Sequence, residues 1–379
     1  DDFEPSGRGL ISRKDMVQGE KIIEIPEKLV LTKEKAAREL GSWLIEPLGE
    51  YIAIALLLVS ERSKGDASFW APYIALLPTA EEVGQSFVWS EEELALLEGS
   101  AVLDSTRSFQ AKLRSEFATV SALSEQHPSS LPASTFTWEG FEWAMSMLFS
   151  RAIDLRELGA LGLVPYADLL NHSPYAQSFF YVNKIPLSPE REVVLYADRN
   201  YGKNDQVLIS YGQKSNAELL LLYGFVVDRN LFDQVELRVS LDESDPYYDE
   251  KAAFLKGQGL KTAMAFPLLI DRYSNELMQF LRLCCVRKSD GPLASFSYNE
   301  PISATNEVAA FTALRDGCNA ALDLYEQTEE EDAALMADGN LFASLTRNQR
   351  MAVKLRRNEK RILLRTISVC DAGIASIRG

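Results

Sequence analysis

Residues 209–218 read Ile-Ser-Tyr-Gly-Gln-Lys-Ser-Asn-Ala-Glu, and residues 223–225 read Tyr-Gly-Phe. The apolar run just before them, residues 207–209, predicts a buried strand that ends at Tyr211. Ser215 and Glu218 stand three residues apart, which is the spacing of a capping box, and they predict a short helix over residues 219–222. One strand end and one helix end are therefore each expected to present a tyrosine, Tyr211 and Tyr223.

Two shorter polar motifs precede this stretch. Residues 150–152 read Ser-Arg-Ala, and residues 167–173 read Ala-Asp-Leu-Leu-Asn-His-Ser. Pro165 and Pro174 flank the second motif and mark positions where regular structure bends. We therefore expect His172 in a loop. Taken alone, Asn-His-Ser is most often an ordinary polar turn, so its meaning depends on the motifs around it.

Together these motifs resemble the SET-domain protein methyltransferases, and specifically the plant Rubisco large-subunit lysine methyltransferase branch. The resemblance rests on four motifs in one order and approximate spacing: residues 7–10 (Gly-Arg-Gly-Leu), 150–152, 168–173 and 211–225. Looser similarity covers nearly the whole chain, including Trp70-Ala71-Pro72-Tyr73 and Trp89-Ser90-Glu91-Glu92-Glu93-Leu94. The resemblance implies S-adenosylmethionine as methyl donor, a protein lysine as acceptor and no metal.

Site residues follow from the resemblance. Those implied to hold the donor are Ser6, Gly7, Arg8, Arg151, Asn171, His172 and Tyr211. Tyr211 is also the implied catalytic residue, which positions the reacting nitrogen and methyl group, and Asp168 and Tyr223 are implied to line the lysine channel. Each has a plainer interpretation. Arg151 near a predicted helix end complements the helix dipole, Tyr211 can be a core tyrosine, and Gly7 can belong to a tight turn.

Composition describes an ordinary globular protein and excludes several classes. The 379 residues are 46% hydrophobic and 25% charged, which does not indicate disorder. The formal net charge of −16 argues against a nucleic-acid surface and favours a cationic partner such as a lysine-bearing protein segment. The chain has no Gly-x-Gly-x-x-Gly after a predicted strand, so a Rossmann-type methyltransferase is not expected.

The four cysteines, Cys284, Cys285, Cys318 and Cys370, lack the spacing of zinc ligands, and we expect reduced thiols. In this the chain differs from many histone-directed SET enzymes, which carry a cysteine-rich zinc segment. The longest apolar run, residues 51–59, is far shorter than the roughly 20 residues that span a bilayer, so no membrane span is expected. No signal peptide is visible, and a plastid location rests on the resemblance alone.

The predicted fold is α+β: a SET core of short strands with a helical insertion, followed by an all-helical C-terminal domain. We place the N-terminal part of the SET core at residues 1–32, the helical insertion at 33–137, the C-terminal part of the core at 138–241, and a substrate- or partner-docking domain at 242–379. Within the core we expect a helix over 138–153 and strands over 10–11, 21–25, 29–31, 179–182, 193–196, 206–210 and 235–241.

Two departures keep other functions open. The Rubisco-directed pattern has a second arginine four residues beyond Arg151, and here that position is Leu155, with Arg156 beside it. An architectural subunit of the plastid transcription machinery with a retained SET fold is therefore the alternative. A histidine methyltransferase is a third hypothesis, but the actin-histidine enzymes lack the tyrosine of the Tyr-Gly-Phe motif, which this chain keeps as Tyr223.

Overall fold

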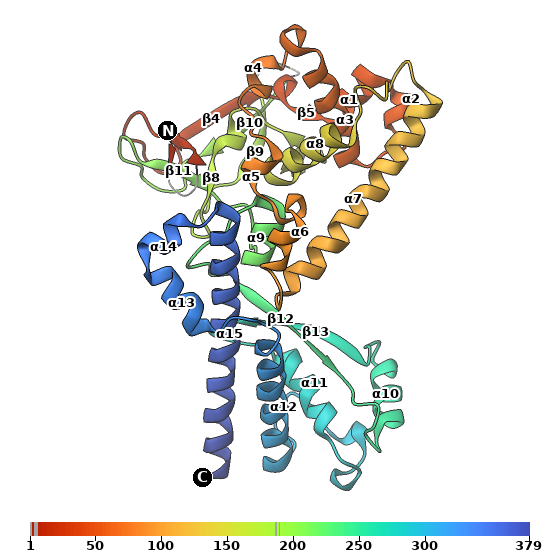
Figure 1. Cartoon of the computed structure of the whole chain (residues 1–379), viewed down its shortest axis with the longest axis vertical. Coiled ribbons are helices and arrows are strands. Elements are labelled where there is room, and N and C mark those ends of the chain that lie inside the picture. The colour runs from red at the N-terminus through yellow and green to blue at the C-terminus, as the bar shows by residue number, and fades with distance from the viewer. Residues whose placement is uncertain (1, 4–6, 186–187, 189) are drawn as a thin grey trace. The chain divides into compact units, whose positions relative to one another are not determined.

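The structure is a computed structural model that describes residues 2–3, 7–185, 188 and 190–379 (Figure 1). The chain folds into two compact units. The first unit consists of Asp1–Trp89, Thr106–Lys214 and Glu218–Phe225, and the second of Ser90–Ser105, Ser215–Ala217 and Val226–Gly379. Helices and short strands both build the fold, which confirms the predicted α+β class.

Within its described residues, the first unit holds three sheets of three short strands each (Figure 1). The first sheet has the order β4 (Lys21–Pro26), β10 (Arg191–Tyr196), β9 (Phe180–Lys184). The second has the order β3 (Leu10–Ile11), β11 (Gln206–Ile209), β8 (Asn171–His172). The third has the order β5 (Leu31–Thr32), β7 (Ala160–Leu163), β6 (Ile153–Leu155). Two further strands, β1 (Asp2–Phe3) and β2 (Gly7–Arg8), pair with each other.

The central strand β10 shows why these segments form a core. Val193, Val194 and Leu195 are all fully buried, so the strand is apolar on both faces rather than alternating. Val193 and Leu195 belong to a cluster that also contains Ile23 from β4 and Ile209 from β11. This shared core ties the first two sheets together.

The second sheet brings two distant motifs side by side. Strand β11 runs parallel to β8, with Leu208 opposite Asn171 and Ile209 opposite His172. Because parallel strands end at the same edge of a sheet, the residues after both strands leave it together. His172 therefore lies in a two-residue strand rather than in the predicted loop, and Tyr211 follows two residues after β11.

Helices make up most of the rest of the first unit. They are α1 (Lys33–Leu40), α2 (Ser42–Ile45), α3 (Glu50–Ser63), α4 (Ala71–Ile74), α5 (Ala80–Val83), most of α7 (Ala101–Gln126) and α8 (Trp138–Arg151). Short 3₁₀ turns are η1 (Glu27–Leu29), η2 (Gly65–Ala67), η3 (Ser86–Val88), η4 (Arg156–Leu158) and η5 (Ala167–Leu169). Helix α9 (Asn216–Tyr223) places its last six residues, 218–223, in this unit.

Helix α8 carries the Ser-Arg-Ala motif at its end and packs on α3. It begins at Trp138 as predicted, because the Thr137 side chain accepts a hydrogen bond from the Gly140 amide and caps it. It ends at Arg151, two residues earlier than predicted, since Ile153 opens strand β6.

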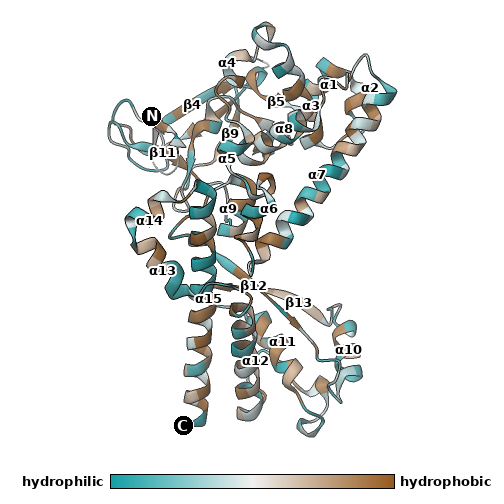
Figure 2. Ribbon diagram, in the orientation of Figure 1, coloured by the Kyte–Doolittle hydropathy of each residue, from teal (hydrophilic) through white to brown (hydrophobic). Residues whose placement is uncertain are grey.

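The second unit packs helices around a two-stranded sheet. Its strands are β12 (Gln234–Ser240) and β13 (Ala263–Leu269). Its helices are α6 (Glu91–Ala95), α10 (Tyr248–Gly257), α11 (Asn275–Cys285), α12 (Ala304–Leu322), α13 (Glu329–Ala337), α14 (Gly339–Ser344) and α15 (Arg347–Arg378), with 3₁₀ turns η6 (Lys288–Asp290) and η7 (Leu293–Ser295). Figure 2 shows both hydrophobic and hydrophilic residues along α15, whose buried Met351, Leu355 and Ile362 follow helical spacing.

The expectation that the C-terminal domain, residues 242–379, is all-helical is wrong at one element. Strand β13 pairs antiparallel with β12, with Leu237 opposite Phe266 and Val235 opposite Leu268. Phe266 and Leu268 are buried on one face. Pro267 between them has no backbone N–H to donate, which an edge strand such as β13 tolerates. Likewise, the predicted strand over 29–31 is a 3₁₀ turn followed by the two-residue β5.

Candidate functional site

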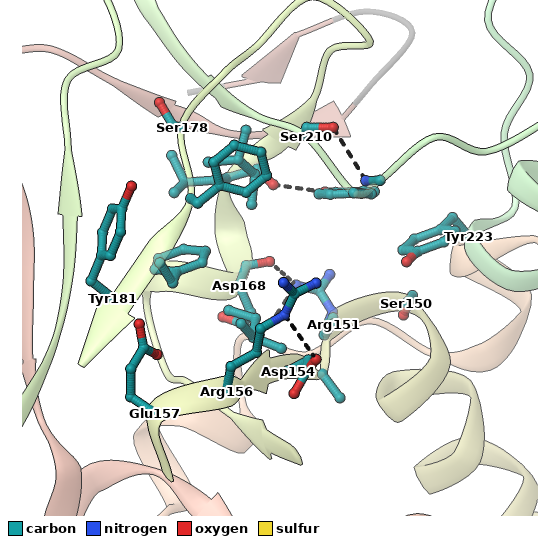
Figure 3. Close-up of a pocket in the computed structure, with 18 residues that line it drawn as sticks. Ser150, Arg151, Asp154, Arg156, Glu157, Asp168, Ser178, Tyr181, Ser210 and Tyr223 are labelled. Atoms are coloured by element: carbon teal, nitrogen blue, oxygen red, sulfur yellow. Dashed lines mark hydrogen bonds and ion pairs between the residues drawn. The ribbon is translucent and has the colours of Figure 1, made fainter. Parts of the chain in front are cut away.

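A cavity of about 500 Å³ lies in the first unit, where the ends of several elements meet (Figure 3). Its lining comes from the end of α8, from β6 and η4, from η5, from the start of β9, from the end of β11 and from the last residue of α9. The lining residues are Ser150, Arg151, Ala152, Ile153, Asp154, Arg156, Glu157, Asp168, Leu170, Ser178, Phe179, Phe180, Tyr181, Ile209, Ser210, Tyr211, Gly212 and Tyr223. Sequence segments that stand more than 70 residues apart therefore share one cavity.

Four of the residues singled out in the sequence lie in this wall: Arg151, Asp168, Tyr211 and Tyr223. Asn171 and His172 lie beside it, in the strand that pairs with β11. Gly7 and Arg8 do not line the cavity, and the exposed Arg8 guanidinium donates a 2.7 Å hydrogen bond to the Leu76 carbonyl. Ser6 lies outside the described residues.

Asp168 is the centre of a buried polar group on the cavity floor. Its Oδ2 accepts a 2.6 Å hydrogen bond from the Tyr73 hydroxyl and lies 3.8 Å from Nη1 of Arg151. The same Nη1 donates to the Asp168 backbone carbonyl at 2.9 Å. Burial raises the pKa of the Asp168 carboxyl, while Arg151 and then the Tyr73 bond act in the opposite direction. Burial also raises the pKa of Tyr73 well above its usual value, so this hydroxyl stays a donor.

Besides Oγ of the lining residue Ser178, three polar atoms of residues singled out in the sequence are buried near the cavity and have no hydrogen-bond partner within the described part of the chain. They are Nε of Arg151, Oδ1 of Asp168 and Nδ2 of Asn171. A buried donor or acceptor without a partner costs about 1–3 kcal/mol, and native proteins rarely leave such groups unmatched. Two donors and one acceptor are therefore available to a bound molecule.

An aromatic group closes the other side of the cavity. The Tyr211 ring stacks on Tyr223 with centroids 4.8 Å apart and on His172 with centroids 5.0 Å apart. Phe225 packs against all three, at centroid distances of 6.3 Å from Tyr211 and Tyr223 and 6.0 Å from His172. The Tyr211 hydroxyl donates a 2.6 Å hydrogen bond to the Leu170 carbonyl.

Burial keeps this aromatic group uncharged. It raises the pKa of Tyr211 and raises that of Tyr223 to about 12. It lowers the pKa of His172 to about 4, and Nδ1 of the neutral ring accepts a 3.1 Å hydrogen bond from the Tyr211 backbone amide. No histidine, lysine or cysteine is found among the described residues that line the cavity. The site is thus suited to holding a neutral nucleophile rather than to removing a proton with a strong base.

The cavity mouth is formed by side chains that the sequence did not mark. Tyr181 and Glu157 lie across from Tyr223 in Figure 3. Phe179 and Tyr181 are 58% and 46% exposed, although both line the cavity. Arg156 also lines it and forms a 3.6 Å ion pair with Asp154.

Leu155, where the Rubisco-directed pattern has an arginine, is 1% exposed and belongs to the sheet core. The guanidinium nearest this position in sequence is therefore that of Arg156, at the mouth. Tyr73 is a further residue of the site that the sequence does not mark. It was noted only as part of the Trp-Ala-Pro-Tyr similarity, and nothing local marks its bond to Asp168.

No group of three or more histidine, cysteine, aspartate or glutamate side chains with a metal-binding arrangement occurs in the described ranges. Within the same ranges, each helix is too short or too polar to cross a membrane. All four cysteines are free thiols, with Cys318 and Cys370 buried and Cys284 and Cys285 half-buried.

Comparison with known proteins agrees with this architecture. A family model for the SET domain matches residues 7–212, and a model for Rubisco LSMT substrate-binding matches residues 242–363. The chain is 31% identical over 373 residues to the chloroplastic [fructose-bisphosphate aldolase]-lysine N-methyltransferase of Arabidopsis thaliana, which covers 95% of this chain and 76% of that protein. It is 30% identical over 393 residues to the actin-histidine N-methyltransferase of Rattus norvegicus, covering 96% of this chain and 64% of that protein.

Among solved structures, the SET domain of LSMT bound to lysine and AdoHcy matches with a TM-score of 0.77 at 28% identity. The match covers 98% of this chain and 86% of that one. Both sequence and fold therefore agree with the resemblance seen in the motifs. The chain belongs to the SET-domain protein methyltransferases, in the branch of the Rubisco large-subunit lysine methyltransferases, which take their methyl group from S-adenosylmethionine.

Proposed function

We propose that this chain transfers a methyl group from S-adenosylmethionine to a lysine side chain of a plastid protein. The observation that carries the proposal is the meeting of Tyr211, Tyr223, Asp168 and Arg151 around one cavity. The family relationship and the neutral, half-buried character of these tyrosines support it.

The cavity and its unmatched polar atoms suit the methyl donor. A volume of about 500 Å³ falls within the range that small-molecule sites occupy. Nε of Arg151 and Nδ2 of Asn171 are buried donors without partners in the described chain, and a carboxylate such as that of a methionine tail accepts such bonds. When bound, S-adenosylmethionine supplies an electrophilic methyl group on a positively charged sulfur. Arg151, Asn171, His172 and Tyr211, which lie in or beside the cavity, are the residues that we assign to holding it. The assignment of Gly7, Arg8 and Ser6 to the donor rests on the family resemblance alone.

On this scheme, the protein must present the acceptor amine without its proton. The pKa of a free lysine, near 10.4, lies about 3.4 units above pH 7. Removing its proton at pH 7 therefore costs roughly 4.6 kcal/mol. Burial beside the stacked rings of Tyr211 and Tyr223 disfavours the ammonium form and reduces that cost. Asp168 and Tyr223 line the channel, and the Tyr211 hydroxyl with the Leu170 carbonyl orients the nitrogen.

The acceptor class and the compartment rest on the relatives. The Arabidopsis relative carries a lysine-methyltransferase name and a chloroplast location, whereas the rat relative acts on actin histidine. Tyr223, which the actin-histidine pattern lacks, favours lysine here. The alternative of a structural subunit in the plastid transcription machinery draws no support from these proteins.

The test is incubation of the purified protein and labelled S-adenosylmethionine with a plastid lysate. We expect label in one or a few proteins, with mass spectrometry placing the methyl group on lysine. A methylated histidine would instead support the histidine alternative. Binding of the donor without any transfer, together with co-purification in a large plastid complex, would overturn the enzyme proposal.

A further inference from the structure

Gln85 is fully buried between α5 and η3 and has no part in the mechanism proposed above. Its amide nitrogen donates to the Leu222 carbonyl at 2.5 Å and to the Ser146 carbonyl at 3.1 Å. Its Oε1 accepts a hydrogen bond from the Ser146 hydroxyl. Both amide hydrogens and the amide oxygen are therefore used, and they connect this loop to the end of α9 and to the second half of α8.

Each of these bonds is next to a residue of the cavity wall. Leu222 directly precedes Tyr223. Ser146 lies one helical turn before Ser150, whose hydroxyl donates to the same Ser146 carbonyl at 2.8 Å. Because Ser150 and Tyr223 both line the cavity, Gln85 links two of its walls through buried hydrogen bonds.

Gly224 supplies a second, independent observation on the same segment. Its φ is +74°, and a Cβ at this position would lie 2.0 Å from the Val83 backbone carbonyl oxygen and 2.8 Å from the Gln85 backbone nitrogen. The backbone after Tyr223 is therefore pressed against residues 83–85, while the carbonyl before Tyr223 is held by the Gln85 side chain. Tyr223 is constrained on both sides along the chain, and its ring stacks on Tyr211.

We propose that Gln85 is a positioning residue for methyl transfer, which sets the location of Tyr223 relative to Ser150 and Arg151. Gln85 does not touch the reacting atoms and acts only through the residues it holds. The reaction in this proposal rests on the proposed function, whereas the positioning can be measured without it. A displacement of about 1 Å in such a site lowers the rate of a positioned reaction by about a hundredfold.

The variant Gln85→Met keeps the length of the side chain and removes both donors. We expect kcat to fall about ten- to hundredfold, with S-adenosylmethionine affinity, measured by calorimetry, within about twofold of the unmodified protein. Gln110→Met is the matched control, because Gln110 donates a similar 3.0 Å bond to the Phe87 carbonyl in η3 and is not among the residues that line the cavity. It should leave kcat unchanged. Ser146→Ala, which removes only the hydroxyl bond to Oε1, should give a smaller loss in the same direction.

Two measurements separate positioning from a general loss of stability. With 3-fluorotyrosine at position 223, Gln85→Met should shift or broaden the fluorine resonance, and Gln110→Met should not. In a double-mutant cycle with Tyr223→Phe, the effects on kcat should be non-additive, since Gln85 acts through Tyr223. An unchanged fluorine spectrum in folded Gln85→Met, or strictly additive effects, would overturn the inference. If the unmodified protein transfers no methyl group, the proposed function fails, and the fluorine spectrum still decides the positioning.

Discussion

The Tyr73 hydroxyl and the Asp168 carboxylate form a 2.6 Å hydrogen bond between residues 95 positions apart in the chain. Asp168 is fully buried at its side chain, and its other oxygen, Oδ1, has no partner among the described residues. This bond therefore fixes the one carboxyl oxygen that Arg151 also faces, and it leaves the second oxygen free for a ligand.

We expect Tyr73→Phe to destabilise the protein by about 1–3 kcal/mol, because it leaves a buried carboxylate oxygen without its donor. Since the Tyr73 bond lowers the pKa of Asp168, its loss should also raise that pKa further. Urea unfolding of the single variant, of Asp168→Asn and of the double variant measures the coupling between the two residues. If the two losses of unfolding free energy simply add, the bond contributes no stability of its own.

Tyr211→Phe should lower kcat by at least about a hundredfold, because it removes the hydroxyl that donates to the Leu170 carbonyl and orients the acceptor. The change should shift Tm by only a few degrees, since the ring and its stacking remain. Transfer of label from S-adenosylmethionine measures the rate, and calorimetry checks that the donor still binds. Tyr201→Phe is the control, because its hydroxyl bonds Asp198 at 2.7 Å outside the cavity. Retained transfer in Tyr211→Phe would exclude the role assigned to this hydroxyl.

Local patterns were sufficient to predict the two tyrosine-bearing ends. Residues 207–209 lie in β11, although this strand ends at Ile209 rather than at Tyr211, and the helix predicted over 219–222 is α9, which extends over Asn216–Tyr223. A capping box formed by Ser90 and Glu93 starts α6 in the same local way. These features depend on neighbours within a few residues, which a single sequence displays.

Contacts between distant segments were not predictable in the same way. Nothing near Tyr73 or Gln85 in the sequence shows that one bonds Asp168 and the other holds the end of α9. Strand β13 was missed for a related reason, because its exposed face carries Ala263 and Pro267 and only pairing with β12 makes it a strand. Such features depend on tertiary packing, which overrides local propensity.

Arg151→Lys should weaken S-adenosylmethionine binding about tenfold, because an ammonium lacks the planar fork that bonds a carboxylate with two donors. Calorimetry gives the dissociation constant directly. Arg62→Lys is the matched control, because Arg62 stacks on the Trp143 ring at 4.1 Å and does not line the cavity. An unchanged affinity in Arg151→Lys would remove Arg151 from the donor site.

At the cavity mouth, Phe179→Ala and Tyr181→Ala should raise KM for the protein substrate by about threefold to tenfold while leaving kcat nearly unchanged. Both rings are exposed and line the cavity, and we expect them to make contacts with the substrate that are equal in the ground state and the transition state. Tyr175→Ala is the control, since Tyr175 is 62% exposed and does not line the cavity. A fall in kcat with unchanged KM would place these rings at the reacting atoms instead.

The second unit contains a carboxyl group that makes its stability depend on pH. Glu359 is 3% exposed, and burial raises its pKa to about 7 although it accepts bonds from Ser100 at 2.8 Å and Tyr325 at 3.0 Å. Burial also raises the pKa of Asp233 to about 6. Because both values lie above those of the unfolded chain, the folded state binds more protons. The associated stability is therefore complete below about pH 4 and is lost as pH rises through 6 and 7.

We therefore expect the unfolding free energy to fall between about pH 4 and pH 7, with a contribution from Glu359 of up to about 3 kcal/mol. Glu359→Gln cannot ionise and should remove most of this slope, while it keeps an oxygen that accepts one of the two bonds. Glu331→Gln is a comparison that changes an exposed capping carboxylate of α13 and should leave the slope intact. Urea unfolding at several pH values measures the slope. A carboxyl group whose pKa is raised in the folded state lowers the unfolding free energy as it loses its proton. If the unfolding free energy instead rises over this pH range, and Glu359→Gln does not change that slope, Glu359 is already ionised in the folded protein.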